Sequence, residues 1–159
     1  MKTYFTLFVL ICCSAFAFSS DKIPDLSGSW VLDNSKEYPA TRLTLVKVDI
    51  KQTADSLHLI RTYTDPRGDN VEFTENMAIG GETVHTEYQG IPRASSVTWS
   101  ENKAAMVINI VITFTRNDQT REAVTLETWR LKDADTLTLE RVNPSVPKDE
   151  PIVYYFHKK

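Results

Sequence analysis

Short strand-forming stretches alternate with turn residues along almost the whole chain, and this pattern constrains the fold more than any other feature. Apolar and polar residues alternate from Leu43 to Ile50, and residues 57–63 and 71–79 follow in the same manner. The turn at 65–70 combines Pro66, which fixes φ, with Gly68, which tolerates positive φ. With a turn roughly every 8 to 12 residues and no helical periodicity, the sequence predicts an all-β domain of about ten strands.

Near-neighbour hairpins of this kind form either a closed antiparallel up-and-down barrel or a β-sandwich. The stretch from Ala105 to Thr115 is apolar on both faces, so an exposed edge there would be a liability that closure removes. A Cys-Trp-Cys sandwich framework is absent from the sequence. We therefore predict an up-and-down barrel of about 8 to 10 strands. Further strands are expected at 28–33, 83–88, 95–99, 123–131, 137–142 and 152–156.

Strict alternation makes a specific prediction for the second strand. Leu45 and Lys47 should face one side of the sheet, and Val46 and Val48 the other.

At the start of the first strand, Gly28 allows close backbone approach and Trp30 provides a large apolar ring. We expect Trp30 to plug one end of the barrel.

Residues 1–18 have the features of a secretory signal peptide. Lys2 provides a basic n-region, the following run is apolar, and Ala15-Phe16-Ala17 fits a small-x-small cleavage site. The alternatives are an uncleaved signal anchor and a lipoprotein. The lipoprotein is disfavoured because neither Cys12 nor Cys13 has the small preceding residue that lipidation requires. Both cysteines lie in this segment, so the mature chain would contain no disulfide. We predict an exported bacterial protein, periplasmic or extracellular.

The charge pattern excludes several partners for the mature chain. The whole chain has a net charge of −3, which becomes −4 when Lys2 is removed with residues 1–18, and opposite charges are interspersed. This pattern argues against nucleic acid or an anionic membrane surface as a partner. Neither a second long apolar stretch nor a linker is present, so we predict no membrane insertion of the mature chain and one domain spanning 26–158. The oligomeric state is left open.

The ends of the predicted domain resemble those of the calycin superfamily, which includes lipocalins, fatty-acid-binding proteins and small exported bacterial lipocalin-like proteins. Gly28-Ser29-Trp30-Val31-Leu32-Asp33 resembles the G-[ST]-W opening of these barrels, and 129–141 resembles their final hairpin. The resemblance implies that Gly28, Trp30 and Arg141 are structural, with the Arg141 guanidinium stacked on the Trp30 indole.

The chain departs from fatty-acid-binding proteins at two points. Pro39 and the β pattern that follows leave no room for a helix-turn-helix lid, and Arg141-Val142-Asn143 lacks the tyrosine of their Arg-x-Tyr motif. Fatty-acid binding in that mode is therefore not predicted.

The most promising site residues are aromatic and methionine side chains on the predicted strands. Such residues suit an apolar or planar ligand if they line a cavity, and they form an ordinary core if the barrel is filled. The predicted ligand-binding set is Tyr63, Phe73, Met77, Tyr88, Trp99, Met106 and Phe114.

The polar candidates are weaker. His58, His85 and His157 lie on different predicted strands and outside any spaced metal-ligand motif, so no metal site or cofactor is predicted. Glu82 and Glu87 beside His85 could perform acid–base chemistry but fit solvent-facing strand positions better. Arg61 and Arg130 are expected to point outward, because an inward arginine needs an anionic partner such as a ligand carboxylate.

The leading hypothesis is an exported, non-catalytic, lipocalin-like barrel that binds a small hydrophobic molecule. The alternative is a filled barrel that acts as a protein-interaction module of the cell envelope through its outer surface. The third is an enzyme whose site at the barrel mouth contains His85.

Overall fold

The computed structural model describes residues 23–39, 41–88, 90–146 and 150–159, and within them the chain forms ten β-strands and no helix. The expected signal peptide, residues 1–18, lies outside the described residues. The strands are β1 (Gly28–Leu32), β2 (Thr44–Gln52), β3 (Ser56–Thr64), β4 (Asn70–Ala78), β5 (Val84–Tyr88), β6 (Ile91–Trp99), β7 (Met106–Arg116), β8 (Gln119–Leu131), β9 (Thr136–Val142) and β10 (Ile152–Lys158).

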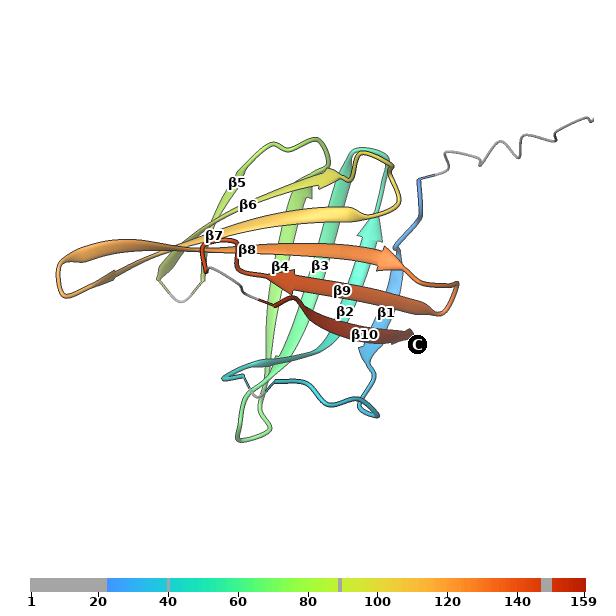
Figure 1. Ribbon diagram of the computed structural model, residues 1–159, viewed down its shortest axis with the longest axis horizontal. Coiled ribbons are helices and arrows are strands. Elements are labelled where there is room, and N and C mark those ends of the chain that lie inside the picture. Colours follow the sequence, from blue (N-terminus) through green and yellow to red (C-terminus); the bar gives the residue numbers. More distant parts are fainter. Residues whose placement is uncertain (1–22, 40, 89, 147–149) are drawn as a thin grey trace, which may run out of the picture.

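All ten strands belong to one antiparallel sheet with the order β4-β3-β2-β1-β10-β9-β8-β7-β6-β5. Strands that are neighbours in sequence therefore pair with each other, except for β4 and β5, which are the two edges of the sheet. In addition, β1 pairs with β10, with Trp30 opposite Lys158. The sheet curls into a nearly closed barrel (Figure 1). The prediction of an all-β up-and-down barrel is confirmed.

The barrel closes between β4 and β6 at one end only. Ile79, just after β4, forms a bridge with Val97 of β6, and the N–H groups of Gly80 and Gly81 donate to the Val97 carbonyl at 3.1 and 2.8 Å. No other backbone pairing joins β4 to β5 or β6 among the described residues. Toward the other end, β4 and β5 are therefore free sheet edges.

The turns follow the sequence signals closely. At the β3–β4 turn, Gly68 has a φ of 91° and its N–H donates to the Asp65 carbonyl at 2.9 Å. The β7–β8 hairpin turns through Asn117 and Asp118, whose φ values of 51° and 58° fit the two-residue turn that matches strand twist. Figure 1 shows that this hairpin projects well beyond the barrel wall.

A β-bulge in β2 overturns the strict alternation expected for this strand. The register with β3 shifts between Leu45 and Lys47, so Leu45 and Val48 are both buried. One extra residue at the bulge reverses which face the following residues occupy. It keeps large apolar side chains inside the barrel along the whole of β2.

The barrel end near Trp30 is filled. Trp30 is fully buried, its Nε1 donates to the Leu26 carbonyl at 2.9 Å, and the Lys158 ammonium lies 5.3 Å from the centre of its ring. Trp30 is therefore a core residue, and its role as the plug of this end stays a prediction. Trp30 belongs to the apolar core, whose buried side chains also include Leu26, Val48, Leu57, Leu59, Met77, Val97, Met106, Trp129, Leu137 and Phe156.

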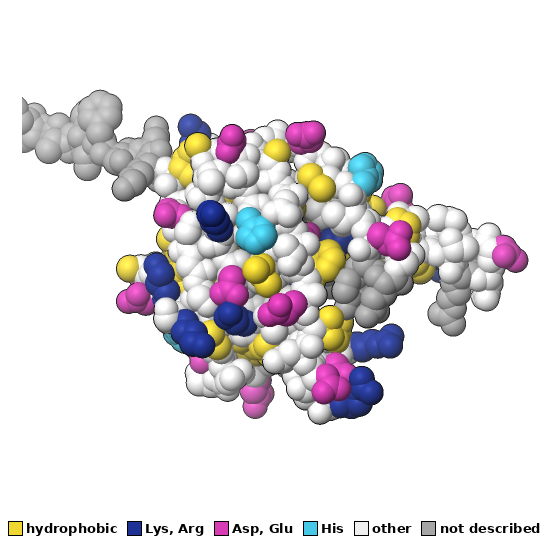
Figure 2. Space-filling model, turned by 180° about the vertical axis from the view of Figure 1, so that it is seen from behind, with side chains coloured by type: hydrophobic (Ala, Val, Ile, Leu, Met, Phe, Trp, Pro, Cys, Tyr) yellow, Lys and Arg dark blue, Asp and Glu magenta, His cyan; other side chains and the backbone are white. Residues whose placement is uncertain are grey.

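The outer surface carries both charge signs. Figure 2 shows Lys and Arg interspersed with Asp and Glu over the visible face, with small apolar patches between them. Within the described part of the chain, no helix has the length and apolar character needed to span a membrane.

Candidate ligand-binding site

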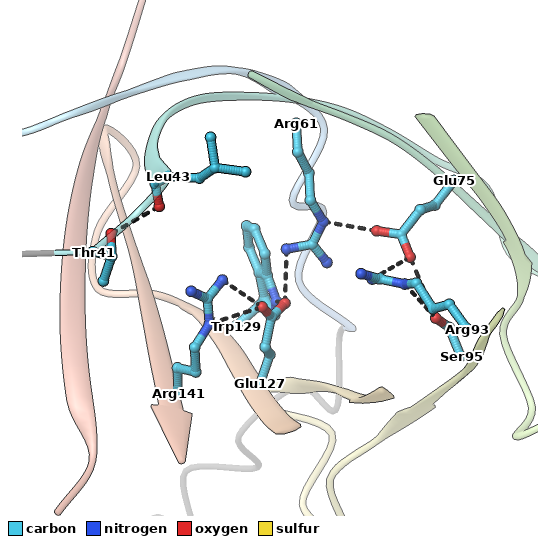
Figure 3. Close-up of polar contacts among 9 residues, drawn as sticks. All are labelled: Thr41, Leu43, Arg61, Glu75, Arg93, Ser95, Glu127, Trp129 and Arg141. Atoms are coloured by element: carbon cyan, nitrogen blue, oxygen red, sulfur yellow. Dashed lines mark hydrogen bonds and ion pairs between the residues drawn. The ribbon is translucent and has the colours of Figure 1, made fainter. Parts of the chain in front are cut away.

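A cluster of charged residues, here called the charged belt, crosses the middle of the barrel interior. It consists of Arg61, Glu75, Arg93, Glu127 and Arg141. At its centre, Arg61 donates from Nε to Glu75 Oε2 at 2.7 Å and from Nη1 to Glu127 Oε2 at 2.8 Å (Figure 3). The side chains of these three residues are only 0%, 2% and 1% exposed. Burial of such charges is tolerated because they are paired and hydrogen-bonded.

Two further arginines complete the belt on the side of the open end. Arg93 Nη2 donates to Glu75 Oε1 at 2.6 Å, and Arg141 Nη2 donates to Glu127 Oε1 at 2.7 Å. These side chains are partly accessible, at 12% for Arg93 and 25% for Arg141. Since Glu75 lies on β4 and Arg93 on β6, one ion pair bridges the two strands between which the barrel closes.

Trp129 contacts two residues of the charged belt, Glu127 and Arg61. Its Nε1 donates to Glu127 Oε2 at 3.1 Å, and the Arg61 guanidinium lies 5.2 Å from the centre of its ring. Glu127 and Trp129 are two residues apart on β8, so both point inward. The indole thus joins the filled apolar end to the charged belt.

The belt sets the ionisation of Glu127. Burial by itself would raise the pKa of this carboxyl, but the positive charges of Arg61 and Arg141 and their hydrogen bonds outweigh it. The pKa of Glu127 is therefore lowered from 4.5 to about 2. Glu127 is therefore an anion in the folded protein at any pH well above about 2.

This lowered pKa predicts acid sensitivity. Because Glu127 binds its proton more weakly in the folded than in the unfolded chain, its stabilising contribution is complete above about pH 4.5 and is lost as the pH falls toward about 2. We expect the stability difference between the wild type and Glu127→Gln, measured by urea unfolding, to shrink over this interval. A difference that is constant from pH 5 to pH 2.5 would contradict the assignment.

Above the belt, at the end away from Trp30, the interior opens into a cup with two lobes. One lobe has a volume of about 180 Å³ and is lined by Tyr63, Arg93, Ile110, Ile112, Thr125, Glu127 and Arg141. The other has about 210 Å³ and is lined by Leu43, Tyr63, Phe73, Arg93 and Ile112. Three lining residues are shared, so the lobes are adjacent parts of one hollow.

Guanidinium groups and aromatic rings form part of the cup wall. Arg93 lies 4.8 Å from the centre of the Phe73 ring, and Arg141 lies 5.4 Å from that of Tyr154. Leu43 is presented by the loop before β2, where the Thr41 hydroxyl donates to the Leu43 carbonyl at 2.8 Å (Figure 3). The cup therefore combines apolar surface with cationic groups that already have carboxylate partners.

The predicted ligand-binding residues fall into different parts of the barrel. Tyr63 and Phe73 line the cup. Met77 and Met106 are buried in the apolar core, and Trp99 packs against it, so these three lie away from the cup. Phe114 is exposed on the projecting hairpin. The side chain of Tyr88 lies outside the described part of the chain.

The calycin resemblance implied that the Arg141 guanidinium stacks on the Trp30 indole, and this prediction is wrong. Arg141 lies over Tyr154 and binds Glu127, while the cation over Trp30 is Lys158. The register explains this, since Trp30 is opposite Lys158 of β10. Arg141 lies farther up the barrel, opposite Ile152 of β10. A cation does cover the Trp30 indole, but it comes from a different strand.

The expected outward orientation of Arg61 is also wrong, whereas Arg130 is exposed as predicted. Arg61 has the same parity on β3 as Leu57 and Leu59, and this was the available signal for an inward side chain. Sequence reasoning missed Glu75, Arg93 and Glu127. Each shares the inward face of its strand with a core residue, but no pattern indicated that their charges would meet.

The alternative polar candidates lie outside the cup. His85, Glu82 and Glu87 are exposed at β5 and the turn before it. His157 faces Asp33 at 3.3 Å on the outer side, and His58 bonds to Asn76. No group of three potential metal ligands occurs among the described residues.

No family model matches the chain, and no curated protein matches it in sequence. The nearly closed antiparallel barrel is compatible with a calycin-like fold.

Proposed function

We propose that this protein is an exported, non-catalytic barrel that binds a small, largely apolar molecule in the cup. The observation that carries the proposal is the contrast between the two ends of the interior. One end is filled by Trp30 and its neighbours, whereas the other leaves an open hollow with Leu43, Phe73 and Ile112 on its walls. Apolar pockets with a few polar groups are the usual form of small-molecule sites.

The size of the cup limits the ligand. Each lobe, at about 180 and 210 Å³, is smaller than the roughly 300 Å³ at which pockets for drug-sized ligands begin. A molecule that fits would occupy one lobe or bend across both. The residues 1–18 support delivery outside the cytoplasm.

Filling the cup tests this function. Ile112→Trp on β7 places an indole where both lobes meet, so we expect at least tenfold weaker binding of any ligand that stabilises the wild type. The ligands to screen by thermal shift are short acids, alcohols, amides and aromatic compounds. The matched control is Val111→Trp, whose side chain lies on the opposite face of the same strand and should leave binding unchanged.

Two outcomes contradict the proposal. One is the absence of any co-purifying molecule and any thermal shift across the screen. The other is equal binding by the Ile112→Trp and Val111→Trp variants. Either would favour a filled barrel that works through its outer surface.

A further inference from the structure

We infer that the natural ligand is a small organic monoanion whose charged group binds between Arg93 and Arg141, above Arg61, with its apolar body against Phe73 and Ile112. This inference rests on the proposed function and names the ligand class. It follows from the charge balance of the belt, from one unused hydrogen-bond donor and from the apolar surface that lies beside the cationic groups of the cup.

The belt carries one more positive than negative charge. Arg61, Arg93 and Arg141 contribute three cations, and Glu75 and Glu127 contribute two anions. Among the described residues, no other carboxylate forms an ion pair with these arginines. An uncompensated charge is unfavourable in a partly buried site. A ligand with a single negative charge would balance the cluster.

Arg61 also has a donor without a partner. Its Nε and Nη1 groups bind the two glutamates, but Nη2 is buried and has no hydrogen-bond partner among the described residues. Figure 3 shows Nη2 directed toward the gap between Glu127 and Arg93. Both of those residues line the cup. An unsatisfied buried donor is costly, so this gap is suited to an acceptor atom.

The cup wall presents both of the chemical groups that an amphipathic anion needs, cationic and apolar. Arg93 and Arg141 are partly accessible and can offer charge-assisted hydrogen bonds to a carboxylate. Beside them, Phe73, Ile112 and Leu43 provide apolar surface, with Ile112 opposite Arg93 in the pairing of β6 with β7. Because each lobe is small, the apolar body is a single ring or a short branched chain.

Phenylacetate and its neutral analogue phenylacetamide test the inference. They differ chiefly in charge, and both bring one aromatic ring. We expect calorimetric titration of the processed protein to show at least tenfold tighter binding of phenylacetate, with affinity that decreases as salt concentration rises. This comparison needs no variant, so it does not depend on the folding of an altered belt.

Two variants locate the charged group. In Arg93→Gln and Arg141→Gln, phenylacetate affinity should fall toward that of phenylacetamide. The control Arg130→Gln, exposed on β8 outside the cup, should retain the preference for the acid. A loss that is equal in all three variants would overturn the assignment of the anion to the belt.

The outcomes separate this inference from the proposed function. Equal affinities for acid and amide, both lost in Ile112→Trp, would overturn the monoanion and leave the cup as a binding site. Binding of neither probe, together with no hit in the wider screen, would overturn both.

Discussion

Replacing Glu127 by glutamine is expected to lower the free energy of unfolding by about 3–5 kcal/mol, a large part of the stability of a domain of this size. Glutamine keeps the shape and can still accept from Trp129 Nε1, but it removes the negative charge that Arg61 and Arg141 share. Arg61 is fully buried and cannot turn to water to compensate. Urea unfolding followed by circular dichroism measures the change.

The matched control is Glu122→Gln on the same strand. Glu122 is exposed, so this substitution should change the stability by less than about 0.5 kcal/mol. A double variant, Arg61→Met with Glu127→Leu, should lose less stability than the sum of its single variants, because each single change leaves the other buried charge with one ion-pair partner fewer. Equal effects of Glu127→Gln and Glu122→Gln would show that the belt contributes nothing to folding.

Truncation of Trp30 to alanine is expected to destabilise the protein by about 3–5 kcal/mol. The indole is fully buried at the filled end of the barrel, so its removal leaves a cavity among well-packed side chains. It also removes the donor to the Leu26 carbonyl and the ring beneath the Lys158 ammonium. The same urea measurement applies.

Two comparisons separate packing from hydrogen bonding at this position. Trp30→Phe keeps much of the ring volume but leaves the Leu26 carbonyl without its donor, so we expect a loss of about 1–3 kcal/mol. Trp99→Ala removes an indole that is only partly buried and should cost less than Trp30→Ala. If Trp30→Ala is the milder of the two alanine variants, Trp30 is not the plug.

The architecture was predictable because it is encoded locally. Alternation and turn residues such as Pro66 and Gly68 specify strands and hairpins over a few residues, and all ten strands appear near their expected positions. The alternation of apolar and polar residues failed to predict which face of the sheet the β2 side chains occupy, because pairing with β3 decides this. The bulge at Leu45 and Lys47 changes the face of the residues that follow, and nothing in the local pattern marked it.

The site was less predictable because its parts come from strands far apart in sequence. Tyr63 and Phe73 could be proposed as apolar lining, since aromatic residues on strands commonly line barrels. Arg61 was misassigned because a buried arginine is favourable only when it has anionic partners, and the sequence alone did not identify them. Those partners, Glu75 and Glu127, lie on other strands, and their charges meet only once the barrel has closed.

The pairing of β1 with β10 has a consequence for the time course of folding. Trp30 reaches its partner Lys158 only after almost the entire chain is present, and the pairing closes a very long loop. Barrels with such non-local pairing fold slowly, and their early hairpins expose unpaired edges meanwhile. A barrel that cannot close until β10 has been synthesised stays open until then, and an open chain is one that can be threaded through a membrane before it folds.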